Sequence, residues 1–139
     1  MERRTARELM ERLEGDAARI ARRFGLRYRS LEAERAGVNG HYGICYDDGT
    51  IRIRLRHAVT GRPLKYSSLV NTLCHELAHL RHFDHGERFK AFYFELLGYA
   101  RREGIYRPGP GPRAAAPRPE APTRRLGPAQ LDLFQALLG

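Results

Sequence analysis

The organisation of this chain is read most directly from residues 69–89, LVNTLCHELAHLRHFDHGERF. Leucines recur here at intervals of three and four residues, the spacing that places side chains on one buried face of a helix. These leucines are Leu69, Leu73, Leu77 and Leu80. Ser67 or Ser68 can cap the start of this helix, which we expect to continue through about Phe83.

The same stretch contains the motif HExxH, formed by His75, Glu76 and His79. Residues four positions apart lie one above the other on a helix, so both imidazoles can bind one metal ion from the same side. The pattern is typical of a catalytic zinc site, in which each nitrogen lies about 2.0–2.1 Å from the ion. The alternative is a chance HExxH on a buried helix, which would leave polar side chains unsatisfied in the absence of a metal.

In such a site Glu76 is the expected general base, which takes a proton from the attacking water and passes it to the leaving amine. Tyr99, Tyr106 and nearby arginines are candidates for stabilising the oxyanion, and the sequence does not choose among them.

Catalytic zinc sites usually have three protein ligands, so a third ligand is expected beyond the motif. Four side chains downstream qualify by type, namely His82, His85, Glu87 and Glu95. His82 would lie too far along the same helix, so we interpret it as a neighbour of the site or a surface residue. His85 is favoured because Asp84 and Gly86 can turn the chain back toward the metal, and Glu95 on the next helix is the alternative.

The residues around this stretch predict a second helix at 86–102 and, before the motif, a helix followed by a β-hairpin. Near the N-terminus, apolar residues recur at helical spacing and stop at Gly25, where a helix can end. They are Leu9, Leu13, Ala17, Ile20 and Phe24. From residue 26 to residue 57 the period becomes two, and the Asp48-Gly49 turn between two alternating runs indicates a hairpin. This order of elements predicts an α+β domain.

The second strand of this hairpin alternates strictly between apolar residues and arginines. We expect one face to be buried, with Ile51, Ile53 and Leu55, and the opposite face to carry Arg52, Arg54 and Arg56. Cys45 and Cys74 lack the spacing of a zinc site and are interpreted as small buried residues.

The complete spacing HExxHxxxxxH, followed by Phe89, resembles the SprT-like, WLM and YgjP-like group of small zinc metalloproteases. The segments 69–89 and YGICYDDGTIRIRL (42–55) carry the resemblance, which covers roughly residues 40–100. The chain departs from the YgjP-like pattern at Ile44, where that pattern usually has serine, and it lacks the cysteine-rich ribbon of some SprT domains.

The resemblance implies a zincin-like core with one zinc ion held by His75, His79 and His85, and with Glu76 as the base. It also implies an edge strand beside the metal, to which an extended substrate peptide can add. Metzincins share the ligand spacing but have a glycine where this chain has His82, and a methionine turn after the third histidine. The methionines here, both in the first ten residues, precede the site, so that class is excluded.

The chain changes character toward its C-terminus. Seven of the eight prolines lie between Pro108 and Pro128, and the stretch 107–128 contains one leucine and no aromatic residue. Because this composition cannot supply a packed apolar face, we expect a disordered, extended linker. We therefore divide the chain into a protease domain (1–106), a Pro-, Gly- and Arg-rich linker (107–128) and a terminal peptide (129–139).

The terminal peptide contains the run Gln130, Leu131, Asp132, Leu133 and Phe134. This run resembles the bacterial sliding-clamp-binding motif, in which a glutamine and two spaced apolar residues occupy a small pocket on the clamp. A recruitment motif is accessible at the end of a linker, which agrees with the resemblance. The alternative is an amphipathic terminal helix that packs back onto the domain.

The formal net charge is +9, and residues 101–128 contribute seven arginines against two glutamates. Arginines on a flexible linker suit sequence-independent contact with DNA phosphates. The candidates are Arg113, Arg118, Arg124 and Arg125. Alternatively, these charges only keep the linker soluble and extended.

Composition excludes several classes of protein. Two cysteines cannot form a disulfide framework or a four-cysteine zinc ribbon, and no run of eighteen apolar residues could span a membrane. The charged N-terminus lacks the apolar segment of a secretory signal, so we expect a cytoplasmic, nucleoid-associated bacterial protein.

Together these features predict a zinc metalloprotease that the sliding clamp recruits to DNA, where it cuts DNA-bound or cross-linked proteins. SprT-like proteases of eukaryotes pair a protease domain with a clamp motif, and this layout is similar. The alternative function is a non-catalytic, metal-stabilised adaptor that docks a partner on the clamp. The presence of Glu76 argues against the adaptor, because a purely structural metal site does not need that residue.

Overall fold

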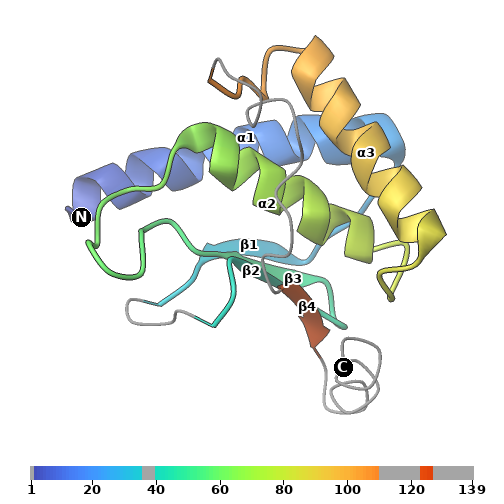
Figure 1. Cartoon of the computed structure of the whole chain (residues 1–139), viewed down its shortest axis with the longest axis horizontal. Helices are drawn as coiled ribbons and strands as arrows, with labels where there is room; N and C mark the ends of the chain where they lie inside the picture. The colour runs from blue at the N-terminus through green and yellow to red at the C-terminus, as the bar shows by residue number, and fades with distance from the viewer. Residues whose placement is uncertain (1, 36–39, 110–122, 127–139) are drawn as a thin grey trace.

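The computed structural model describes residues 2–35, 40–109 and 123–126. Its three helices lie over one face of a small sheet, which confirms the predicted α+β architecture (Figure 1). In chain order the elements are α1 (Arg3–Phe24), β1 (Ser30–Ala33), β2 (Gly43–Tyr46), β3 (Thr50–Ile53), α2 (Tyr66–His79), α3 (Glu87–Arg102) and β4 (Thr123–Leu126).

The sheet has the strand order β1-β3-β2-β4. β2 and β3 form the predicted antiparallel hairpin, which turns at Gly49 with a positive φ of 93° that favours glycine. β1 pairs parallel with β3, and β4 pairs parallel with the other edge of β2, with Thr123 opposite Gly43. β2, which packs against α2, is therefore paired at its outer edge with a strand from the C-terminal part of the chain.

α1 follows the predicted apolar stripe and packs Leu13, Ala17 and Ile20 into the core without exposure. It ends at Gly25, which adopts the left-handed conformation with φ 67°. This residue caps the helix because a side chain there would be strained, and its N–H bonds to the Ala21 carbonyl. The N-terminal helix was thus predictable from the spacing of its apolar residues and from the glycine at its end.

α2 differs from its prediction at both ends. It begins at Tyr66 after Lys65, and neither serine makes the expected side-chain cap. Its first turn is held instead by the Tyr66 hydroxyl, which donates to Asp16 on α1 at 2.6 Å. The helix ends at His79 rather than near Phe83, because the following N–H groups of Leu80 and Arg81 bond to carbonyls three residues back and tighten the chain.

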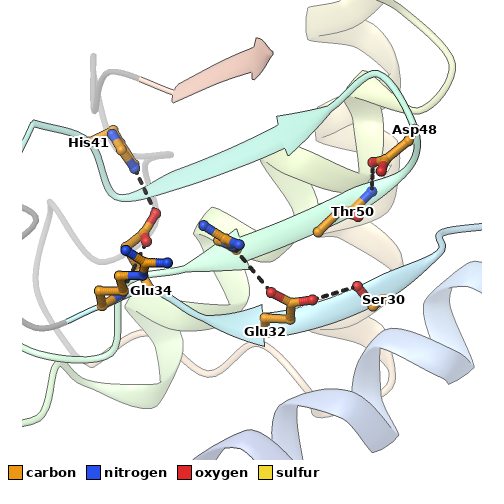
Figure 2. Close-up of polar contacts among 8 residues, drawn as sticks. Ser30, Glu32, Glu34, His41, Asp48 and Thr50 are labelled. Carbon is orange, nitrogen blue, oxygen red and sulfur yellow. Dashed lines mark hydrogen bonds and ion pairs between the residues drawn. The ribbon is translucent and has the colours of Figure 1, made fainter. Parts of the chain in front are cut away.

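Of the two inner strands, β3 alternates as expected, with Ile51 and Ile53 buried, whereas Gly43, Ile44 and Cys45 of β2 are all buried. Polar contacts join the neighbouring strands on the other side. Glu32 on β1 accepts from Arg52 on β3 at 3.2 Å (Figure 2). The strict alternation of the second hairpin strand therefore positions one apolar face toward α2.

β4 falls inside the segment predicted as a linker. Of residues 107–128, the structure describes 107–109 and Thr123–Leu126, and the latter four residues pair with β2. The predicted terminal peptide, 129–139, lies outside the described residues. No helix among the described residues is long and apolar enough to cross a lipid bilayer.

Candidate metal centre

Three histidines converge where α2 meets the start of α3. α2 supplies His75 and His79, and the turn that precedes Glu87 supplies His85. One ring nitrogen from each histidine lies within 4.8 Å of the other two. His79 Nε2 and His85 Nε2 are only 3.0 Å apart, so these two rings point their ligand atoms at one place.

The donor set fits a single metal ion. With metal–nitrogen distances of 2.0–2.1 Å, two ligands of a tetrahedral zinc ion lie about 3.3 Å apart, which is close to the His79–His85 separation. Three imidazoles also leave one position of a tetrahedral ion for a water or a substrate oxygen, as catalytic sites require. The third ligand that we favoured, His85, is the one that the fold brings beside the HExxH pair.

The backbone orients His79. Its Nδ1 lies 3.1 Å from the carbonyl oxygen of His82, so an Nδ1–H donor would fix the ring with Nε2 toward His85. The side chain of His79 is completely buried. We interpreted His82 as a neighbour of the site. Its carbonyl oxygen lies beside His79, whereas its ring packs edge-on to Phe92 with a centroid distance of 5.7 Å.

One aromatic ring holds the three ligands together. Phe89 is 2% exposed and stacks on His79 with a centroid distance of 4.4 Å. The Phe89 ring also packs edge-on with His75 and His85, at centroid distances of 4.8 and 5.0 Å. The sequence identified Phe89 only as part of the family pattern, whereas the structure shows that it is the shared packing partner of the donor set.

Glu76 lies beside this donor set in a dry environment. Its side chain is completely buried, and its Oε2 is 3.5 Å from His75 Nδ1. β2 packs closely on it at Gly43, where a Cβ atom would meet both Thr72 and Glu76. Glycine on β2 therefore leaves the room that the carboxylate occupies next to the histidines.

Tyr93 on α3 is a further neighbour of the site. Its ring lies 5.1 Å from that of His75, and its hydroxyl donates to the buried Asn71 side chain, one turn before His75 on α2. A hydroxyl within an apolar helix stripe is the signal that could have suggested this contact. The pair ties α3 to α2 directly beside the first metal ligand.

The other candidates lie elsewhere. Glu87 and Glu95 are exposed on α3 and are outside the histidine group. Tyr99 packs edge-on to Phe24 of α1 at 5.6 Å, and the buried Tyr106 lies beneath the Arg101 guanidinium. Tyr93 is the tyrosine whose ring packs against the first of the three histidines, at 5.1 Å from His75.

The cysteines are not metal ligands among the described residues. Cys45 and Cys74 are both completely buried and unbridged. Burial raises the pKa of the Cys74 thiol well above its ordinary value of 9.0, which disfavours the thiolate that binds metals. Cys74 therefore acts as a small apolar residue next to His75, as its position suggested.

The predicted clamp and DNA contacts fall mostly outside the described residues. Residues 130–134, Arg113 and Arg118 belong to the parts of the chain that the structure does not describe. Arg124 and Arg125 are residues of β4, whose backbone pairs them with Ile44 and Cys45 of β2. These contacts stay predictions.

Known proteins resemble this chain in their family and in their fold. Residues 2–105 match the family model for the WLM domain. The fold is similar to that of Wss1 from Saccharomyces cerevisiae, with a TM-score of 0.68 and 19% identity over 74% of this chain and 84% of that chain. It is also similar to a mutant of Wss1 from S. pombe, with a TM-score of 0.60 and 22% identity over 68% of this chain and 84% of that one.

A search of curated proteins gave no match. At these levels of identity the solved structures establish the likeness of the fold, whereas the family match extends over most of the described chain. It includes the hairpin, the HExxH helix and the helix that carries Phe89. The chain therefore belongs to the WLM family of metalloproteases.

Proposed function

We propose that this chain is a zinc-dependent endoprotease that cuts proteins bound or cross-linked to DNA. The observation that carries the proposal is the convergence of His75, His79 and His85 beside the buried carboxylate of Glu76. A structural metal site needs ligands only, whereas a hydrolytic site also needs a base within reach of the attacking water. This arrangement supplies both.

The residues divide the chemistry between them. A zinc ion held by the three histidines would polarise the scissile carbonyl and lower the pKa of a water molecule. Glu76 accepts the proton of the attacking water and delivers it to the leaving amine nitrogen. The contact of Gly43 with the Glu76 side chain keeps this carboxylate in one position, and burial excludes bulk water from it.

The outer edge of β2 is the proposed binding place for the substrate backbone. It begins at Gly43, in contact with the base, and it accepts an extended strand, since β4 pairs there through residues 123–126. A substrate peptide added to this edge would pass directly in front of Glu76. Main-chain hydrogen bonds of this kind allow many different sequences to bind.

Recruitment to DNA is the second part of the proposal and rests on the sequence alone. The run 130–134 would bind the bacterial sliding clamp, and the arginines of residues 101–128 would contact DNA phosphates without sequence preference. The protein would then act in the cytoplasm at the nucleoid. A tether between protease and clamp raises the effective concentration of DNA-bound substrates.

The direct test is cleavage of a protein cross-linked to DNA. We expect cleavage by the full chain in the presence of zinc, loss of cleavage with a chelator, and recovery when zinc is returned. Adding loaded clamp should increase the rate on DNA-bound protein but leave the rate on a free peptide unchanged. If no protein or peptide is cleaved at any zinc concentration, the adaptor function is favoured.

Clamp binding is tested separately. Purified clamp is titrated with a peptide of residues 127–139 and with the same peptide carrying Gln130→Ala and Phe134→Ala. We expect the altered peptide to bind at least tenfold more weakly, since it loses both anchors of the motif, roughly 1.4 kcal/mol or more. Equal affinities would remove the clamp from the proposal and leave the protease unaffected.

A further inference from the structure

A basic cavity lies between the segment that leads into β2 and the first turn of α2. It has a volume of about 740 Å³ and is formed by the residues before β2, the segment after β3 and the first turn of α2. Its charged and aromatic walls are His41, Tyr42, Arg54, Arg62 and Lys65. No aspartate or glutamate lines it among the residues that the structure describes.

Arg54 is the unusual residue of this cavity. The sequence predicts it on the outer face of its strand, yet the whole residue is only 7% exposed. Its guanidinium lies 4.3 Å above the Tyr42 ring, and its Nε has no hydrogen-bond partner among the described residues. A guanidinium buried without an anionic partner is costly, so a ligand that supplies a carboxylate or phosphate would be bound strongly there.

Glu34, which contacts the cavity residue His41, is already engaged. Glu34 pairs with His41 at 3.0 Å, and both side chains are largely buried (Figure 2). Burial raises the pKa of Glu34, but the hydrogen bonds from His41 and from the Arg35 backbone hold that pKa below its usual range. This carboxylate is therefore ionised at neutral pH and is already hydrogen-bonded to the His41 imidazole and the Arg35 backbone.

The cavity lies at one end of a row of α2 side chains that includes Glu76, the proposed general base. Ser68 lines the cavity, Thr72 contacts Gly43, and Glu76 follows. Because these residues are four apart, they lie along one side of the helix, and Ser68 is about 12 Å from Glu76 along the axis. An extended peptide covers that distance in about three to four residues.

We propose that this cavity is a substrate subsite that binds an acidic side chain, an aspartate or a glutamate, about three to four residues from the scissile bond. Arg54 binds the carboxylate inside the cavity. Arg62 and Lys65, which are both exposed, attract it from the rim. The inference rests on the proposed peptide hydrolysis, because it assumes that substrates follow the edge of β2.

A nucleic acid strand is the competing occupant, and the geometry favours the peptide. Single-stranded nucleic acids bind through aromatic platforms and exposed cations that follow the backbone. Here Arg54 covers the Tyr42 ring, and the Arg54 guanidinium is buried rather than exposed on an open surface. A buried guanidinium that lines a cavity suits one planar carboxylate.

The experiment measures peptide binding, so that it does not require catalysis. A fluorescent peptide is titrated with full-length, zinc-loaded Glu76→Gln protein, and a single glutamate is moved one position at a time along the peptide, with glutamine as the isosteric control. We expect one position at which glutamate binds about tenfold more tightly than glutamine. Equal binding of glutamate and glutamine at every position would overturn the proposal.

Arg54→Met should abolish this preference, and Arg52→Met is the matched control because Arg52 lies two residues earlier, on β3, but pairs with Glu32. If Arg54→Met does not fold, Arg62→Ala and Lys65→Ala replace exposed residues and should each reduce the glutamate preference severalfold. An unchanged preference in both, or in folded Arg54→Met, would contradict the subsite.

A competition arm separates the two occupants. If a single-stranded oligonucleotide displaces the glutamate peptide, and Arg54→Met weakens the oligonucleotide and the peptide equally, the cavity binds phosphate and our proposal is wrong. Failure of the proposed protease function would appear differently, as a retained glutamate preference in binding without cleavage of any peptide by the wild-type chain.

Discussion

Gly43 on β2 lies directly against Glu76 on α2, so closely that a Cβ atom at position 43 would be 3.0 Å from Glu76 Cγ and 3.1 Å from its Oε2. The same Cβ atom would also be 2.7 Å from Thr72 Cγ2, so the close approach of β2 and α2 requires glycine here. The position of the proposed base is therefore determined by a residue that has no side chain and that no catalytic motif includes.

Replacing this glycine should impair catalysis without removing the metal ligands. We expect Gly43→Ala to displace the Glu76 carboxylate and lower kcat/KM for a peptide roughly tenfold to a hundredfold, since misplacement by about 1 Å has effects of this size. Zinc affinity should stay unchanged. Gly15→Ala is the control, because position 15 has open space around it. Equal kcat/KM values for the two variants would show that Gly43 does not position the base.

Phe89 should determine how firmly the metal is held. Phe89→Leu removes a ring that contacts all three histidines, and we expect zinc affinity to fall about tenfold, the lower end of effects from residues that orient ligands. Phe92→Leu is the matched control, since this equally buried ring packs on Phe24 and His82 instead. Competition with a chromophoric chelator measures both affinities. The same zinc affinity in both variants would rule out this role.

Alkaline pH should destabilise the domain through Tyr66. Burial, followed by the hydrogen bond to Asp16, raises the pKa of Tyr66 above its ordinary value of 10.0. Above pH 10 the unfolded chain loses this proton while the folded chain keeps it, so the free energy of unfolding falls as pH rises. Below pH 10 this group adds no pH dependence.

Urea unfolding of wild type and Tyr66→Phe measures this contribution. At neutral pH the variant should be less stable by about 1 kcal/mol, for the lost hydrogen bond to Asp16. The difference should shrink above pH 10, because only the wild type carries the titrating group. A difference that stays constant from neutral pH to pH 11 would contradict the assignment.

Because β4 occupies the outer edge of β2, an extended substrate has to displace it. Deleting residues 110–139 should therefore raise kcat/KM for a free peptide several-fold, mainly through a lower KM. The full-length chain with Gln130→Ala and Phe134→Ala keeps β4 and should cleave the peptide at the wild-type rate. If the deletion leaves kcat/KM unchanged, β4 does not compete with substrate.

Much of the site followed from local spacing in the sequence. The helical spacing of HExxH and the turn residues around His85 predicted which histidines could meet, and the Asp48-Gly49 turn predicted the hairpin. These features depend on contacts between residues close in the chain. The helix end at His79 was missed, because it depends on a tightened turn in which the N–H groups of Leu80 and Arg81 bond to carbonyls three residues back.

Long-range pairings were less accessible. β1 has four residues and a single buried side chain, Leu31, so its alternation is too short to identify a strand that pairs parallel with β3. Arg54 follows the polar half of an alternating strand, which predicts exposure, yet it is buried with its guanidinium over the Tyr42 ring. Tyr93 and Asn71 are on different helices, and only their packing brings the hydroxyl to the amide.

The most direct test of the central claim compares wild type with Glu76→Gln in the same preparation, by zinc content and by cleavage of a peptide. The account predicts one zinc ion per chain in both proteins, and a loss of cleavage in the variant of about a hundredfold or more, the usual contribution of a general base. Cleavage by Glu76→Gln at the wild-type rate, with zinc bound, would contradict the claim that this buried carboxylate is the base.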